Sequence, residues 1–283
     1  MATISESVTY LCHKWHLSDI HPLVALSPTR NYVARAYSAV YETDVVLKIL
    51  MEESCEAQVL RLFNGNGYVK LLEYAPEYNA FLIENIIPGT RFSILFHHDD
   101  LRSLEIMASL VAKTQTIDIQ DYENEFPTVE QWMEEMDACT SQKIPQDVLR
   151  KAYGMSQMLL RSEQPRYLLH GDLHHKNIVQ CADNPLDSRS WVIIDPKGVI
   201  GPLEFEVVRF LMNPIPALLE QPNPKEIIQP RIELLHELFG FQKERLRDWL
   251  FVVAVLSACW ASENEDYFFN YFMRIVQLVD KEL

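Results

Sequence analysis

The sequence Leu168-Leu-His-Gly-Asp172-Leu-His-His-Lys-Asn177-Ile-Val decides the fold, together with Trp191-Val-Ile-Ile-Asp195 further along the chain. Both segments combine a short apolar run, typical of a buried strand, with polar side chains beside it. Two such strands would present Asp172, Asn177 and Asp195 around one cleft. Phosphoryl transfer from ATP needs such groups: a carboxylate that orients or deprotonates the attacking hydroxyl, and hard oxygen ligands that hold Mg²⁺ at the phosphates.

The first ninety residues have β character, and most of the remaining sequence has helical periodicity. Pro88-Gly89 marks the change, so we expect a small lobe over residues 1–87 and a hinge with a larger helical lobe over residues 88–283. In the small lobe one helix is expected over Glu52–Phe63, closed by the two glycines of Asn64-Gly-Asn-Gly67. The expected strands are Tyr32–Tyr37, Asp44–Leu50, Tyr68–Tyr74 and Ala80–Ile87.

Apolar residues at helical spacing predict a series of helices in the second part. Thr128 with Gln131 three residues later predicts a capped helix start, and Gly240 a helix end. A single strand pair is expected among these helices. The expected helices contain or span Leu101–Val111, Trp132–Cys139, Val148–Arg161, Leu203–Met212, Lys225–Phe239, Lys243–Ser262 and Asp266–Leu283.

Composition excludes several classes of protein. With 283 residues, 48% hydrophobic and 23% charged, the chain resembles an ordinary globular protein. The net charge of −15 disfavours nucleic acid and anionic membranes as partners. Five scattered cysteines without a Cys-x-x-Cys pair favour a reducing compartment, and no apolar run is long enough to cross a bilayer. We therefore expect a cytoplasmic protein with no obligate protein partner.

The motif His-x-Asp-x-x-x-x-Asn, followed by an apolar strand that ends in Asp, resembles the signature of small-molecule kinases with a protein-kinase-like fold. The longer strings His170-Gly-Asp-Leu-His-His-Lys-Asn177 and Ile194-Asp-Pro-Lys-Gly-Val-Ile-Gly-Pro202 resemble one branch, the aminoglycoside and hydroxyurea antibiotic resistance kinases. The resemblance implies an α+β, bilobal protein-kinase-like fold that uses ATP and Mg²⁺. Asp172 would act as the base or orienter, with Asn177 and Asp195 on the metal.

The resemblance extends into the β-rich part. Lys48 resembles the strand lysine that contacts the α and β phosphates, and Glu56 resembles the helix glutamate that pairs with it. The interval between them is short, so Glu52 or Glu53 is an alternative partner. Backbone groups near Glu84 and Ile86 would contact the adenine edge.

The chain departs from the protein-kinase pattern in two places. The turn expected to cover the phosphates, Leu26-Ser-Pro-Thr-Arg-Asn-Tyr32, contains no glycine, which predicts weaker nucleotide binding. Pro196-Lys-Gly198 follows Asp195 where a protein kinase has Phe-Gly, and no Ala-Pro-Glu comes after it, so we expect a small-molecule acceptor. Lys197 has two open interpretations, a solvated loop residue or a contact to the product phosphate.

The remaining polar and aromatic residues allow a functional and a structural interpretation. Acidic side chains on two segments could form a rim that recognises a cationic substrate, with Glu263 and Asp266 the favoured members, or could be solvated helix faces. We expect His170 to anchor the loop and assign His174 and His175 structural roles, because no third ligand with zinc-site spacing is present. Glu206 and Arg209 have the spacing of a helix-surface pair. Trp260 and the aromatics of Phe268–Phe272 are expected in the core, although Trp260-Ala-Ser-Glu263 also resembles a substrate-side helix segment of the same family.

These features predict transfer of the γ-phosphoryl group of ATP to a hydroxyl of a small, polar or cationic molecule. The resemblance implies an aminoglycoside-type antibiotic such as streptomycin. Two alternatives stay open: a kinase of the same fold that acts on a sugar, amino alcohol or nucleoside without a role in resistance, and a nucleotide-binding pseudokinase.

Overall fold

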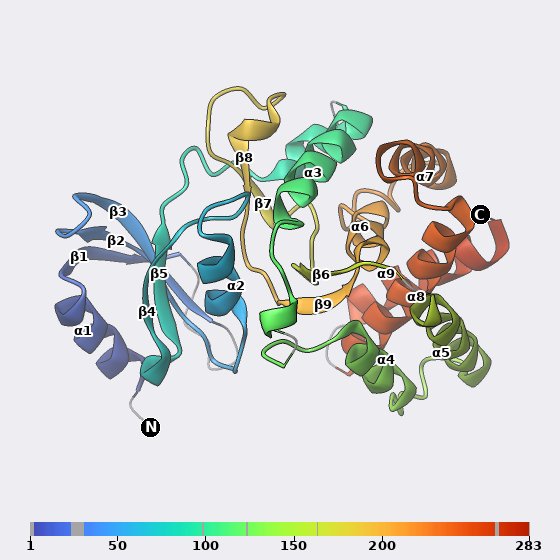
Figure 1. The fold of residues 1–283 in the computed structure, drawn as a ribbon, viewed down its shortest axis with the longest axis horizontal. Helices are drawn as coiled ribbons and strands as arrows, with labels where there is room; N and C mark the ends of the chain where they lie inside the picture. Colours follow the sequence, from blue (N-terminus) through green and yellow to red (C-terminus); the bar gives the residue numbers. More distant parts are fainter. Residues whose placement is uncertain are drawn as a thin grey trace.

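A five-stranded antiparallel sheet forms the N-terminal part of the chain (Figure 1). The computed structural model describes residues 3–23, 31–97, 99–122, 124–162, 164–263 and 266–282. The strand order is β1-β2-β3-β5-β4, so β3 is central and pairs with β2 and β5. The strands are β1 Leu17–Pro22, β2 Tyr32–Ser38, β3 Thr43–Ile49, β4 Leu71–Ala75 and β5 Ala80–Glu84.

Two helices flank this sheet, and one was not expected from the sequence. Helix α1 (Ile4–Lys14) begins at a capping box formed by Thr3 and Glu6, and its Leu11 lies in a small core with residues of the sheet. Helix α2 (Glu56–Phe63) begins four residues later than predicted. It closes at Asn64, which itself adopts the left-handed conformation with φ 45°, ahead of the two glycines.

Helices make up most of the remaining chain (Figure 1). The predicted capping box of Thr128 and Gln131 is confirmed, as is Gly240 at the end of α7, where φ is 73°. Helix α8 is buried over most of its length and packs against α9, α6 and α5. The helices are α3 Asp100–Thr114, α4 Val129–Asp137, α5 Gln146–Arg161, α6 Leu203–Leu211, α7 Lys225–Phe239, α8 Lys243–Ala261 and α9 Asp266–Glu282.

Two strand pairs lie among these helices, so the expectation of a single pair was wrong. β6 (Arg166–Leu169) pairs with β9 (Val199–Pro202), and β7 (Ile178–Gln180) pairs with β8 (Trp191–Ile193). The loop that contains Asp172 therefore runs from one pair to the other. The chain returns from β8 to β9 through Asp195. Both ends of the two polar loops are fixed by strand pairing, which holds the loops beside each other.

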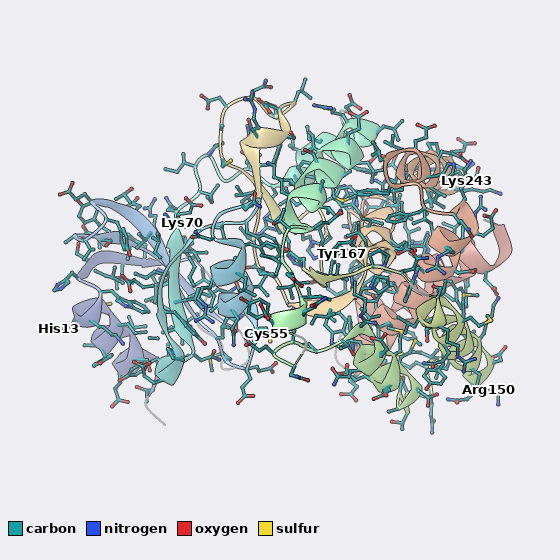
Figure 2. All side chains as sticks on the ribbon, viewed as in Figure 1. His13, Cys55, Lys70, Arg150, Tyr167 and Lys243 are labelled. Atoms are coloured by element: carbon teal, nitrogen blue, oxygen red, sulfur yellow. The ribbon has the colours of Figure 1, made fainter. Side chains whose placement is uncertain are left out.

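The larger hydrophobic core extends from α2 and β5 through the helical part. Backbone bonds also join the two parts: Val69 N–H donates to the carbonyl of Ile193, and Ile193 N–H donates to that of Gly67. Cys55, which precedes α2, lies where the parts meet (Figure 2), with its Sγ 4.0 Å from the carbonyl oxygen of Glu125. The described residues include no helix that is long and apolar enough to cross a membrane.

Candidate active site

A buried ion cluster joins the sheet, α2 and the segment after β8. Strand β3 places Lys48 opposite Phe81 of β5, and its Nζ lies 2.7 Å from both carboxylate oxygens of Glu56. The same Nζ lies 2.7 Å from Asp195 Oδ1. Lys48 and Glu56 are almost fully buried, with side-chain exposures of 7% and 6%. Glu56, rather than Glu52 or Glu53, is the helix partner of Lys48.

The charges in this cluster change one another's proton affinities. Burial by itself would lower the pKa of Lys48, but the Glu56 and Asp195 carboxylates together raise it above its usual value. Burial raises the pKa of Glu56 to about 7, against the opposing effect of Lys48. Burial also acts to raise the pKa of Asp195, but Lys48 outweighs it and holds that pKa below its usual value. Lys48 and Asp195 therefore stay charged at neutral pH.

Asp195 and the loop from Asp172 to Asn177 are linked directly. Asn177 Nδ2 donates to the carbonyl of Asp172 at 3.0 Å, and Ile194 N–H donates to the carbonyl of Asn177 at 2.9 Å. Asp195 holds a left-handed backbone with φ 57°, which is uncommon for a residue with a side chain and is typical of functional sites. The three residues predicted to surround one cleft, Asp172, Asn177 and Asp195, all line a cavity of about 600 Å³ together with Lys48 and Glu56.

His170 braces this loop, as the sequence predicted. Its Nδ1 accepts the N–H of Asp172 at 3.0 Å, and its Nε2 lies 2.8 Å from the carbonyl of Ile194. This network assigns the neutral tautomer with the proton on Nε2. Burial lowers the pKa of His170 to about 4. Glu206 completes the support, because its carboxylate accepts the N–H groups of His170 and Gly171 at 2.8 and 2.9 Å.

The other two histidines have different surroundings. His175 is fully buried against Phe210, with ring centroids 3.8 Å apart, and burial holds its pKa well below the usual value. His174 lies 3.7 Å from Asp172, between Nε2 and Oδ2. In the described part of the chain, no group of three or more His, Cys, Asp or Glu side chains could hold a metal ion by itself.

Mg²⁺ bound with nucleotide phosphates needs only one or two protein oxygens, and Asn177 and Asp195 fit that requirement. The bond from Asn177 Nδ2 to Asp172 fixes the amide, which leaves Oδ1 as its acceptor atom. One oxygen of Asp195 contacts Lys48, and its side chain is 48% exposed. The site therefore offers an amide oxygen and an accessible carboxylate beside a lysine.

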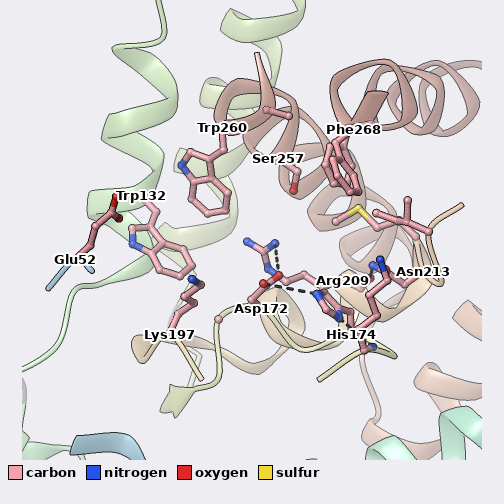
Figure 3. A pocket seen from close by; sticks show the side chains of 16 residues that line it. Glu52, Trp132, Asp172, His174, Lys197, Arg209, Asn213, Ser257, Trp260 and Phe268 are labelled. Atoms are coloured by element: carbon pink, nitrogen blue, oxygen red, sulfur yellow. Dashed lines mark hydrogen bonds and ion pairs between the residues drawn. The ribbon is translucent and has the colours of Figure 1, made fainter. Parts of the chain in front are cut away.

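A second cavity, of about 740 Å³, lies against the other side of Asp172 (Figure 3). Helices α4, α6, α8 and α9 supply much of its wall. The two cavities share Glu52, Trp132, Asp172, His174 and Lys197. Gly171 has a left-handed backbone with φ 83° and lies against the indole ring of Trp132. A Cβ atom at this position would lie only 2.7 Å from that ring. Asp172 thus lies where the two cavities meet.

Arg209 projects toward this second cavity, and the predicted surface pair with Glu206 was wrong. Both side chains are buried, and Glu206 binds the loop backbone instead. Nη1 of Arg209 lies 3.7 Å from Asp172 Oδ1. The spacing of the two residues was compatible with a surface pair, but α6 is buried on all sides. Glu206 therefore reaches the loop backbone and Arg209 the cavity, while Glu204 pairs with Arg245 of α8.

The aromatic residues near the C-terminus were only partly predicted. Trp260 is 44% exposed, so it does not belong to the core as expected, whereas Phe268 and Phe272 are partly buried and pack against the core. All three line the second cavity. Phe269 and Tyr271 are buried, as expected. Sequence reasoning also missed Trp132, which forms an edge-to-face pair with Trp260 at 5.3 Å. The pair joins α4 and α8, which no local pattern could indicate.

The remaining predicted site residues lie at the edges of the two cavities or away from them. The N–H of Glu84 donates to the carbonyl of Lys70, and neither Glu84 nor Ile86 is among the residues that line the two cavities. Asp266 is exposed and pairs with Lys143 at 2.7 Å, and Glu263 is exposed; neither lines these cavities. Lys197 is exposed and lines both. Residues 26–30 of the glycine-free turn lie outside the described part of the chain.

A small antiparallel lobe with a lysine–glutamate pair, joined to a helical lobe with an aspartate loop, defines a bilobal protein-kinase-like fold. Choline kinase LicA of Streptococcus pneumoniae, solved with AMP, has this fold: its TM-score with this chain is 0.67 at 12% identity, over 99% of both chains. A family model for aminoglycoside/hydroxyurea antibiotic resistance kinases matches residues 16–265, and the chain belongs to this family.

Two curated relatives show the range of the family. A hydroxyurea phosphotransferase of Kitasatospora aureofaciens is 28% identical over 235 residues, which cover 78% of this chain and 63% of the relative. A streptomycin 6-kinase of Streptomyces glaucescens is 23% identical over 235 residues, covering 78% and 72%. The match thus spans less than two thirds of the hydroxyurea phosphotransferase.

Proposed function

We propose that this chain transfers the γ-phosphoryl group of ATP to a hydroxyl group of a small molecule. The observation that carries the proposal is the position of Asp172 between two cavities, one of which also contains the Lys48–Glu56–Asp195 cluster. In this proposal ATP occupies the cavity with the cluster, and the acceptor occupies the cavity with Trp132 and Trp260. The family membership supports the same chemistry.

The reaction forms a bond between the acceptor oxygen and the γ-phosphorus, and breaks the bond from that phosphorus to the oxygen bridging the β and γ phosphates. ADP leaves with that oxygen, and the hydroxyl proton passes to Asp172 or to solvent. Asp172 orients the hydroxyl, and Lys48 contacts the phosphates. Asn177 and Asp195 would hold Mg²⁺, which neutralises charge on the phosphates when it is bound.

The arrangement favours preorganised catalysis. The side chains of His170, Glu206 and Asn177 make four hydrogen bonds to the backbone of residues 170–172. These bonds fix the backbone that carries the Asp172 side chain. Such positioning is the main contribution that a protein makes to phosphoryl transfer. Backbone groups near Glu84 and Ile86 at the adenine, and a boundary between lobes at residues 87 and 88, are part of this proposal.

The test is ATP consumption by the purified protein with Mg²⁺, across streptomycin, hydroxyurea and hydroxylated metabolites. Asp172→Ala should abolish transfer, whereas Asp183→Ala, an exposed aspartate of the connection between β7 and β8, should leave it unchanged. Thermal unfolding with and without Mg·ATP supplies a second measurement, because a ligand at about 100 times its Kd adds roughly 2.7 kcal/mol. Transfer by Asp172→Ala, or no stabilisation of the wild type, would contradict the proposal.

The choice of acceptor decides the role in the cell. Turnover of streptomycin or hydroxyurea supports antibiotic resistance, as predicted from the family resemblance. Turnover of a metabolite alone supports the metabolic kinase. Stabilisation by Mg·ATP with no transfer to any acceptor supports the pseudokinase. No feature of the described site favours this alternative, because the cavity retains Lys48, Asp172, Asn177 and Asp195.

A further inference from the structure

Aromatic and apolar side chains form part of the wall of the cavity beyond Asp172, beside charged and polar ones (Figure 3). The Trp132 and Trp260 rings stand edge to face, and both are partly accessible. Flat apolar walls of this kind bind apolar rings and chains by burying their surface. The large apolar side chains of the lining are Trp132, Met212, Ile215, Trp260, Phe268 and Phe272.

The charges in the same lining are opposite to the charge of the whole chain. The chain carries −15, but this cavity is lined by three cations, Lys176, Lys197 and Arg209, against the two carboxylates of Glu52 and Asp172. Asp172 is reserved for the reacting hydroxyl in the function proposed above. A ligand with several positive charges would therefore meet one available carboxylate in this lining, Glu52, which also borders the nucleotide cavity.

Arg209 has hydrogen-bond donors without partners. Its side chain is 4% exposed, and its Nε and Nη2 atoms have no hydrogen-bond acceptor among the described residues. The guanidinium lies 5.3 Å from the ring centroids of both Phe205 and Trp260. Figure 3 shows it directed into the cavity beside Asp172. A buried donor without an acceptor is unfavourable, so a ligand oxygen here gains the full value of a charge-assisted bond.

We propose that the acceptor is a neutral or anionic hydroxy compound with an apolar group, and that its carbonyl or carboxylate oxygen binds the Arg209 guanidinium beside the hydroxyl held at Asp172. This inference rests on the proposed phosphotransferase function. The 3.7 Å between Nη1 and Asp172 Oδ1 sets the spacing, since an oxygen on the carbon next to the hydroxyl-bearing atom can reach the guanidinium. The apolar group then lies between the two tryptophans.

Three compounds with one skeleton test this. Mandelate, mandelamide and 2-amino-1-phenylethanol share a phenyl ring and a secondary hydroxyl, and differ in carrying a carboxylate, a carboxamide or an aminomethyl group. We expect kcat/KM for mandelate and mandelamide to exceed that for the amino alcohol by about tenfold or more, the value of one bond to a charged group. Streptomycin in the same assay represents the polycation.

Variants of Arg209 assign the preference to this residue. Arg209→Gln should reduce the ratio between the carboxylate and the amino alcohol to near one, and Arg209→Lys should retain part of it, because lysine keeps the charge but loses the planar fork. The ratio is the readout, since a structural role of Arg209 would lower all rates together. Arg189→Gln, at an exposed arginine paired with Asp187, is the matched control and should keep the wild-type ratio.

The wild-type panel keeps the inference falsifiable if Arg209→Gln does not fold. A preference for streptomycin or for the amino alcohol overturns it, as does the absence of turnover and of thermal stabilisation with both mandelate and mandelamide. In those cases stabilisation by Mg·ATP and turnover of another acceptor leave the phosphotransferase standing. Failure of Mg·ATP to stabilise the protein, with no turnover of any compound, rejects the proposed function and the inference together.

Discussion

The two sides of Asp172 satisfy their buried charges in opposite ways. On the side of β3 and α2, Lys48 lies within 2.7 Å of two carboxylates and none of its charge is left unpaired. On the side of α6 and α8, Arg209 is equally buried, yet two of its three nitrogens lack an acceptor among the described residues. The buried cation of the first side has all its partners within the protein, whereas that of the second side needs a ligand to supply them. The difference indicates a fixed chemical task on one side and selection of a molecule on the other.

The largest expected effect comes from the residue between the two sides. Asp172→Asn keeps the size of the side chain but removes its charge, so it should lower kcat by about 10²–10⁴-fold, the usual contribution of a positioned acid or base. Stabilisation by Mg·ATP should persist, because Lys48 and Asp195 are unchanged. Steady-state kinetics and thermal unfolding measure the two properties separately. Loss of both stabilisation by Mg·ATP and phosphoryl transfer would show that Asp172 belongs only to the side of β3 and α2, which we call the nucleotide side.

Removing the cation of the nucleotide side should destabilise the fold. Lys48→Met leaves the buried carboxylate of Glu56 without its partner, and breaking such a pair costs about 3 kcal/mol. The loss in unfolding free energy should be larger at pH 8 than at pH 5, because beside Lys48 the pKa of Glu56 is about 7: the carboxyl is charged at pH 8 and already protonated at pH 5, where losing the cation costs less. Urea unfolding at both pH values measures it.

The double variant Lys48→Met with Glu56→Gln sharpens this result. It removes both charges of the pair, so it should recover most of the lost stability at pH 8 without recovering stabilisation by Mg·ATP. Lys70→Met, at an exposed position, is the matched control and should change stability by less than about 0.5 kcal/mol. If Lys48→Met alone were as stable as the wild type, Glu56 would not depend on Lys48. That result would contradict the inference that the charges on this side satisfy one another without a ligand.

A smaller effect concerns the support of the Asp172 loop. Burial lowers the pKa of His170 to about 4 from 6.5, so the folded protein binds fewer protons than the unfolded chain between these pH values. The contribution of the neutral ring is fully present above pH 6.5 and is lost as the pH falls through 4. Unfolding free energy should therefore fall more steeply from pH 6.5 to 4 in the wild type than in His170→Asn, by up to about 1.4 kcal/mol per pH unit.

The comparison between variants isolates this histidine. Glu56 and Glu206, whose pKa values burial raises to about 7, contribute slopes of the opposite sign in both proteins. His13→Asn, on the exposed face of α1, should give the same curve as the wild type. Parallel curves for the wild type and His170→Asn would mean that burial does not hold the ring neutral.

The same contrast between the two sides explains which residues the sequence could predict. The residues of the nucleotide side lie in short local patterns: a lysine in an apolar strand, a glutamate in the next helix, and the spacing from Asp172 through Asn177 to Asp195. Asp172, Asn177 and Asp195 were predicted from their spacing and the strands beside them, whereas Lys48 and Glu56 were predicted from the family resemblance, with Glu52 or Glu53 as alternative partners. The structure brings the five residues together. The helices of the larger lobe were also found, because their apolar spacing is regular.

The residues on the side of α6 and α8, which we call the acceptor side, could not be predicted from local patterns. They come from α4, α6, α8 and α9, and which faces of these helices meet depends on packing between segments far apart in the chain. Arg209 and Trp260 have the local sequence context of an ordinary helix, and only burial of the whole of α6 places Arg209 at a cavity. Helix α1 was missed although the sequence contains its signals: Thr3 and Glu6 have capping-box spacing, and Ile4, Val8 and Leu11 lie at helical spacing.

The smallest expected effect tests the acceptor side itself. Arg209→Met should change the unfolding free energy by less than about 1 kcal/mol, because it removes buried donors that have no acceptor, and the one contact that it breaks is 3.7 Å long and reaches an Asp172 side chain that is 35% exposed. Nε and Nη2 lose no bond, and contacts of the thioether with Phe205 and Trp260 offset the lost cation–π contacts. Urea unfolding beside Lys48→Met gives the comparison directly. A loss of unfolding free energy as large as that of Lys48→Met would mean that Arg209 stabilises the fold. The buried charges on both sides of Asp172 would then be satisfied without a ligand.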